Sequence, residues 1–168
     1  GGSTTAAVYN QSGGTLAGAG TFTITGPSPS TWSGGNMTET GTTVVQGPLA
    51  ITGSVGLDTG RTLSVQGTTT WTSGTINLNP TNDAGNTANG VISVAVGGVF
   101  DAQTDTSLFA SDHSACCGNN DGGANAQVIN AGTFKKTAGA GTMAISVPFT
   151  NTNTGTILAQ SGTLQVNS

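Results

Sequence analysis

Short stretches in which apolar and polar residues alternate recur along the whole chain. Residues 21–25, 63–65, 76–78 and 164–166 each place an apolar residue at every second position. Alternation with a period of two puts the apolar side chains on one face of a β-strand. No window repeats apolar residues at helical spacing over three turns, so the pattern predicts an all-β fold.

Many of these stretches begin with the triplet Gly-Thr-apolar. In this triplet, Gly is expected to accept the positive φ of a tight corner, Thr to start a strand with its side chain in solvent, and the apolar residue to point inward. The triplets begin at Gly14, Gly20, Gly74, Gly132, Gly141, Gly155 and Gly162, with a longer version at 41–44.

The arrangement of the turns favours a coil over a meander of hairpins. The pairs Asn89-Gly90 and Asp121-Gly122 close long polar stretches rather than joining two adjacent strands. We therefore predict a single domain, residues 1–168, folded as a right-handed parallel β-helix (β-solenoid) with polar loop insertions; the handedness follows from the general rule for parallel crossovers. Coils of about 20 residues predict roughly eight coils and a rod of about 40 Å. The alternative fold is a jelly-roll β-sandwich.

Two polar regions interrupt the rhythm, near 77–90 and 101–127. They contain most of the acidic residues and the single His. We expect them to leave the coil as loops and to gather on one face, as insertions in solenoids do. A specific site, if the chain has one, is expected there.

Charge is scarce. Only 6% of the residues are charged and the net charge is −4. This disfavours nucleic-acid binding, which depends on clustered Lys and Arg. No apolar run is long enough for a membrane-spanning helix. In a parallel coil, equivalent side chains of successive coils stack in a row, or ladder. Like charges in such a ladder would repel one another, whereas ladders of Thr, Asn or Ser can form hydrogen bonds.

Longer motifs follow one another in a characteristic order: a GRTL corner, a Trp-Thr-x-Gly strand, GVFDAQ, AGTFKK, then VPFTNTNTGTI and SGTL. In this order nearly the whole chain resembles the β-solenoid repeat regions of large bacterial surface and secreted proteins, the adhesin or autotransporter-like group. The resemblance implies an extracellular, non-enzymatic, structural or adhesive role. It supplies no catalytic residues.

The residues themselves also argue against an enzyme. Carboxylates are scattered through turns, where Asp is favoured for its backbone geometry. His113 stands beside Asp112, with Ser111 and Ser114 flanking them, but a catalytic triad is assembled across a fold rather than within one loop. We predict no catalytic residues and no required cofactor.

Calcium is the one cofactor that the loops could hold. Residues 118–123 and 79–86 offer carboxylate, amide and carbonyl oxygens, the ligands that Ca²⁺ prefers. Neither stretch has EF-hand or nonapeptide spacing. Turns explain most such clusters, and the residues to examine for calcium are Asp83, Asn119, Asn120 and Asp121.

Cys116 and Cys117 are adjacent in the second polar region. A vicinal disulfide, bridges to other molecules and reduced thiols are the alternatives. An extracellular setting favours oxidation, and two adjacent cysteines do not make a zinc site. We predict an intramolecular vicinal disulfide.

Other surface functions leave weaker signals. Alternating Thr at 21–25 and 68–72 could order ice, but the spacing does not recur at a fixed interval. An exposed Trp32 or Tyr9 could stack on a sugar, whereas Trp32 and Trp71 are expected in the core. Asn10 and Asn36 match the glycosylation sequon, which matters only in a glycosylating host.

The ends of the chain show no capping element before the first triplets or after residues 164–166. The chain starts at Gly1 without Met, as expected of a mature product or an excised segment. Uncapped terminal coils template further strand pairing. We therefore expect an extracellular or cell-surface structural subunit that stacks head to tail with copies of itself into a filament, or forms part of a surface fibre. The alternative is an adhesin module that binds glycan or another surface.

Overall fold

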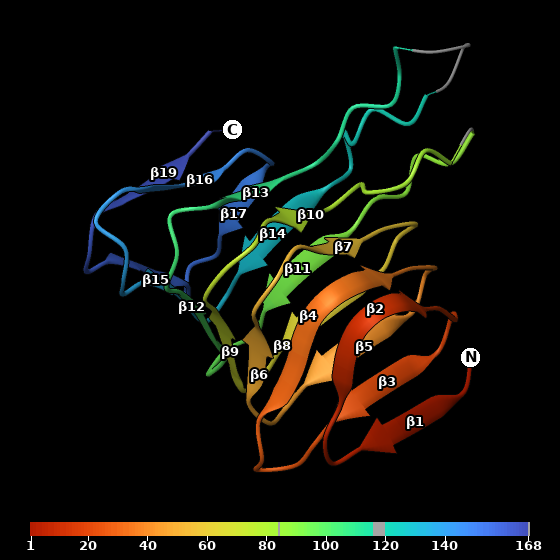
Figure 1. The fold of residues 1–168 in the computed structure, drawn as a ribbon, viewed down its shortest axis with the longest axis horizontal. Coiled ribbons are helices and arrows are strands. Elements are labelled where there is room, and N and C mark those ends of the chain that lie inside the picture. The colour runs from red at the N-terminus through yellow and green to blue at the C-terminus, as the bar shows by residue number, and fades with distance from the viewer. Residues whose placement is uncertain (84, 116–119, 168) are drawn as a thin grey trace.

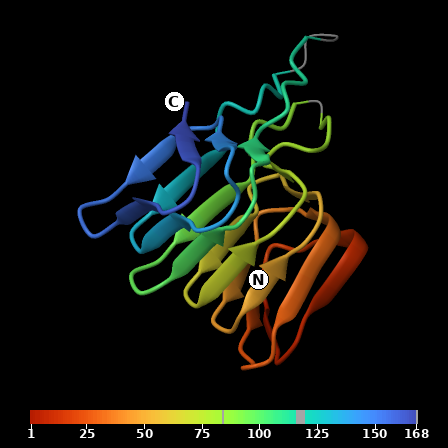
Figure 2. The ribbon, with the colours of Figure 1, turned by 60° about the vertical axis from the view of Figure 1, so that its left-hand side comes forward.

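The chain folds as a parallel β-helix, as predicted (Figure 1). The computed structural model describes residues 1–83, 85–115 and 120–167. Within these ranges it contains 19 strands and no helix, and every pairing between the strands is parallel. Successive strands therefore stack as the coils of one solenoid (Figure 2).

The first face of the solenoid is a seven-stranded sheet. Its strands follow one another in chain order, and each strand between the two edge strands pairs with the strand one coil earlier and the strand one coil later. They are β1 (Ser3–Ala6), β3 (Thr21–Ile24), β5 (Thr42–Val45), β8 (Thr62–Val65), β11 (Val91–Val94), β14 (Gln127–Asn130) and β17 (Phe149–Asn151).

The second and third faces form one continuous twelve-stranded sheet. Strand β4 (Ser30–Met37) joins the two faces, because its first half pairs with β6 and its second half with β7. Strand β2 (Asn10–Leu16) pairs with both halves of β4, with two shifts of register between them. The second face continues through β6 (Leu49–Ile51), β9 (Thr68–Trp71), β12 (Val99–Ala102), β15 (Thr133–Lys136) and β18 (Thr156–Ala159). The third continues through β7 (Val55–Leu57), β10 (Ile76–Asn77), β13 (Ser107–Phe109), β16 (Thr142–Ile145) and β19 (Thr163–Val166).

The coils number seven rather than the expected eight, because two coils are longer than the others. Thr42 pairs with Thr62, about one ordinary coil later, but Thr62 pairs with Val91 and Val91 with Gln127. The extra residues of these two coils form the polar loops. With strands about 4.8 Å apart, seven coils make a rod of about 34 Å.

Apolar ladders fill the interior. On the second face, Phe100 and Phe134 are fully buried, and their rings stack 4.9 Å apart with an angle of 6° between their planes. Trp71 packs edge-on against Phe100, and Phe149 edge-on against Phe134. These contacts run from coil to coil, so aromatic packing stabilises the stacking of the last four coils on one another.

Polar ladders cross the coils as expected. The amide of Asn130 donates to the side-chain oxygen of Asn151, 2.7 Å away in the next coil. Gln46 and Gln66 form a similar amide hydrogen bond at 3.2 Å. At these two positions uncharged amides therefore stabilise the stacking of neighbouring coils without ion pairs.

The role predicted for the triplet glycines is correct at some corners and wrong at others. Gly74 has a φ of 74°, as a tight left-handed corner requires. Gly132 has no positive φ, but an added Cβ would overlap the carbonyl oxygens of Ala95 and Gly98 in the preceding coil. At Gly132, therefore, the close stacking of one turn on another requires glycine, rather than the backbone dihedral.

Candidate functional site

The two polar loops project from the same side of the solenoid, as expected (Figures 1 and 2). The first lies between β10 and β11, and the second between β13 and β14. The second loop is shorter than the predicted 101–127, because Asp101–Ala102 complete β12 and Ser107–Phe109 form β13.

Asp121 joins the two loops. Its side chain is only 1% exposed. One carboxylate oxygen accepts a hydrogen bond from the amide of Asn79 at 2.8 Å and a longer one from Asn89 at 3.4 Å. The other accepts the backbone N–H of Asp83 at 3.1 Å. A carboxylate of the second loop is thus satisfied by donors of the first, which fixes the loops together.

Around Asp121 the polar contacts continue. Asn89 donates to the side-chain oxygen of Asn79 at 3.0 Å and accepts the backbone N–H of Asn125 at 3.0 Å.

Asp58 is a second buried carboxylate beside the first loop. It is 2% exposed and accepts hydrogen bonds from the backbone N–H and the hydroxyl of Thr81. Burial raises the pKa of Asp58, and the bonds from Thr81 oppose that rise.

The four residues considered as calcium ligands do not all lie together in the described structure. Asp83 and Asp121 lie together, Asn120 is exposed beside them, and Asn119 lies outside the described residues. In the described part of the chain, no group of three or more His, Cys, Asp or Glu side chains could hold a metal ion. N–H donors face both oxygens of Asp121, so its carboxylate is stabilised by the loops themselves.

The His113 group is held by bonds within the loop cluster. The ring Nε2 of His113 lies 3.1 Å from the carbonyl oxygen of Asn79, and its backbone N–H donates to the carbonyl of Asp121. Asp112 instead accepts from the backbone N–H and hydroxyl of Ser114, and these bonds lower its pKa. Ser111 bonds to Asn77 at 2.7 Å. These side chains therefore bond in three different directions and form no chain of the Ser-His-Asp kind.

Cys116 and Cys117 lie outside the described residues, so the vicinal disulfide stays a prediction.

The aromatic side chains considered for sugar stacking are largely inside. Trp32 and Trp71 are both fully buried, as expected of core residues. Tyr9 is partly buried, with its ring edge-on to Phe22 and its hydroxyl 2.9 Å from the side-chain oxygen of Gln11. Trp32 therefore has no face free to stack on a glycan.

The regular Thr array needed for ice binding is short. Outward positions of the first face stack as Thr21, Thr42 and Thr62, but the ladder then continues with Val91. Thr69, in the second Thr-rich stretch, points inward and is fully buried.

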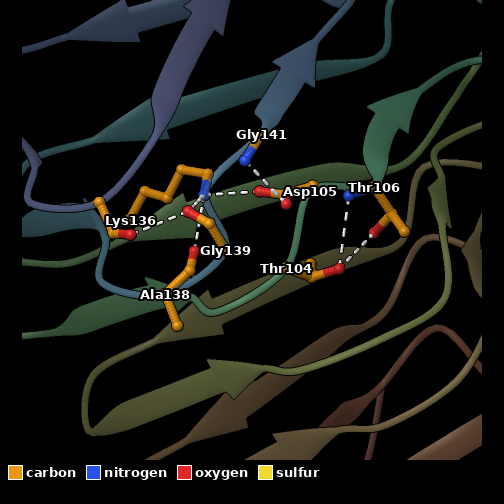
Figure 3. A network of polar contacts seen from close by, with 8 residues as sticks. Thr104, Asp105, Thr106, Lys136, Ala138, Gly139 and Gly141 are labelled. Atoms are coloured by element: carbon orange, nitrogen blue, oxygen red, sulfur yellow. Dashed lines mark hydrogen bonds and ion pairs between the residues drawn. The ribbon is translucent and has the colours of Figure 1, made fainter.

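One ion pair joins a buried lysine to an exposed aspartate, which the sequence analysis did not predict (Figure 3). Lys136 is the last residue of β15 and is fully buried. Its ammonium lies 2.7 Å from a carboxylate oxygen of Asp105 and also donates to the carbonyl oxygens of Ala138 and Gly139. The bond from Lys136, followed by one from the backbone N–H of Gly141, lowers the pKa of Asp105.

The two ends of the solenoid expose strand edges. Among the described residues, the first strands, β1 and β2, pair only with the following coil, and the last strands, β17, β18 and β19, pair only with the preceding one. At the last coil the interior ladders also reach the surface. Ile157 continues the ladder of Phe100 and Phe134, which are fully buried, yet it is 42% exposed; Val166 continues the ladder of Ile145 and is 40% exposed.

Comparisons with protein-family models, with curated proteins and with solved structures gave no significant match to this chain. In the described part of the chain there is no helix of the length and apolar character needed to cross a membrane.

Proposed function

We propose that the chain is a structural unit of an extracellular fibre, in which the last coil of one copy pairs with the first coil of the next. The observation that carries this proposal is the exposure of Ile157, an interior ladder position at the free edge of the last coil. A further coil stacked on that edge would bury it as Phe134 is buried.

The shape of the two ends supports such a joint. Each terminal coil presents strands on the same three faces, so a joint would repeat the parallel pairing found between all the inner coils. The contact is heterologous, because one end meets the other, and a heterologous contact need not close into a ring. The same edges would be used if further coils of one longer polypeptide continued the solenoid.

The charge distribution also supports end-to-end contact. After Asp121 the chain contains no acidic residue, and its only basic residues there are Lys135 and Lys136. Both are paired with carboxylates, at 3.5 Å and 2.7 Å. Little electrostatic repulsion therefore opposes the approach of another copy to the last coil.

Negative-stain electron microscopy and sedimentation of the purified chain test this proposal. We expect rods that lengthen with protein concentration and whose axis is the solenoid axis. Ile157→Asp places a charge on the edge of the last coil and should abolish elongation. The matched control is Val96→Asp: Val96 is 73% exposed in the turn between β11 and β12, away from both ends, and its substitution should leave elongation unchanged.

Two results would count against end-to-end assembly. One is a wild-type chain that stays monomeric at its highest soluble concentration. The other is an equal loss of elongation in both variants, which would indicate general effects of charge rather than a joint at the last coil.

A further inference from the structure

A cavity of about 320 Å³ opens near the N-terminal end of the solenoid. It lies where the chain passes from the end of β2 to the start of β3, and its apolar wall includes Leu16, Ala17 and Phe22. Gly18 and Thr4 also line it. The cavity is at the small end of the range of ligand pockets in proteins.

Arg61 is the one lining residue that comes from a later coil. It precedes β8, is only 1% exposed, and extends through the interior toward the N-terminal end. Its Nη2 and Nε donate to the hydroxyl of Thr43 at 2.8 Å and 3.2 Å, one coil back. Its Nη1 donates to the carbonyl oxygen of Gly18 at 2.9 Å, two coils back. The guanidinium is thereby fixed at the wall of the cavity.

The charge of Arg61 has no anionic partner in contact. In the described ranges, the ion pairs are Lys135–Asp101 and Lys136–Asp105, and neither involves Arg61. Tyr9 and the exposed Glu39 act on it only at longer range, and burial lowers its pKa. A buried cation without a counter-charge is costly, so an anion in the cavity would be stabilised by this group.

The hydrogen-bonding capacity of the guanidinium also favours an anionic ligand. A guanidinium has five N–H groups, and three of those of Arg61 donate to Thr43 or Gly18. The remaining N–H groups lie on the two terminal nitrogens, which form the fork that pairs with a carboxylate.

We infer that the cavity binds a small monocarboxylate with an apolar body, its carboxylate on Arg61 and its apolar part against Leu16 and Phe22. A side chain from the last coil of a second copy does not supply the carboxylate, since no acidic side chain follows Asp121. The cavity is lined by residues of the first coil, which is also one side of the proposed end-to-end joint, so ligand binding is tested on the unassociated chain.

Benzoate is a suitable probe, with benzamide as its neutral counterpart of the same shape. Titration of the full chain, below the concentration at which it associates, is followed by the amide NMR signals of Gly18 and Gly20. We expect saturable shifts with benzoate, with a Kd of roughly 1 mM, and at least tenfold weaker binding of benzamide.

Two variants separate the roles of charge and space. Arg61→Met should weaken benzoate binding at least tenfold, because the cation is removed while much of the side-chain volume is kept. Ala17→Trp should block the cavity while keeping Arg61, which tests the site even if the first variant folds poorly. The inference is overturned if benzoate causes no saturable shift up to about 10 mM, or if benzamide, Arg61→Met or Ala17→Trp gives unchanged affinity.

Discussion

The ammonium of Lys136 is fully buried and lies 2.7 Å from Asp105, whose side chain keeps 41% of its surface exposed. The pair is therefore asymmetric. The lysine depends on its partner and on the carbonyl oxygens of Ala138 and Gly139, whereas the exposed aspartate also accepts the backbone N–H of Gly141 (Figure 3). Removing one member should consequently have a different effect from removing the other.

Asp105→Asn should lower the free energy of unfolding, because it leaves the buried ammonium of Lys136 without a counter-charge. Lys136→Met should keep stability within about 1 kcal/mol of wild type, or raise it, since an apolar side chain of similar length fills the same space and Asp105 can be hydrated. Urea unfolding followed by circular dichroism measures both. If Lys136→Met instead loses more stability than Asp105→Asn, the three hydrogen bonds of the ammonium contribute more than burying an unpaired charge costs.

The stability difference between wild type and Asp105→Asn should depend on pH. The pKa of Asp105 is lower in the folded chain than in the unfolded one, so its ionised form stabilises the fold. This contribution is fully present above the unfolded pKa of about 3.9 and is lost as the pH falls through the lower, folded pKa. Unfolding of both proteins at a series of pH values measures it, and a difference that stays constant down to the acid limit would contradict it.

The buried position of Lys136 was visible in the sequence, but its partner was not. In the stretch 133–136, alternation places Phe134 inward and therefore Lys136 inward too. Asp105 lies in a preceding coil that carries the long second loop, so the interval between the two residues depends on a coil length that the sequence did not show. The same alternation places Arg61 inward, two positions before Leu63.

Register explains the other features that the sequence did not predict. Alternation and turn residues were sufficient for parallel coils, for buried Trp32 and Trp71, and for loops on one side. Contacts between coils require the pairing of strands, and this pairing brings Asp121 to Asn79. Because most neighbouring strands carry similar Thr-, Gly- and Val-rich sequences, local patterns do not select one register.

Gly132→Ala should destabilise the fold by roughly 1–3 kcal/mol, because the new methyl group would overlap backbone oxygens of the preceding coil. The control is Gly13→Ala in β2, where an added Cβ meets no atom within 4 Å and φ is not positive. That substitution should change stability by about 0.5 kcal/mol or less. Thermal or urea unfolding compares the two, and equal effects would contradict the stacking role of Gly132.

Asp121→Asn should loosen the contact between the two polar loops. The side chain of Asp121 accepts from Asn79, Asn89 and the backbone of Asp83, and an amide in its place turns an NH₂ group toward one set of these donors. A buried donor left without an acceptor costs roughly 1–3 kcal/mol. Hydrogen exchange of the loop amides and urea unfolding should both detect the change. Asp112→Asn is the matched control in the same loop, because Asp112 is exposed and, within the described residues, its side chain bonds to Ser114 alone, so little change is expected. N–H donors already satisfy the carboxylate of Asp121, so a chelator should not shift the melting temperature of the wild-type chain. A rise in melting temperature with calcium that Asp121→Asn abolishes would instead identify these loops as a calcium site.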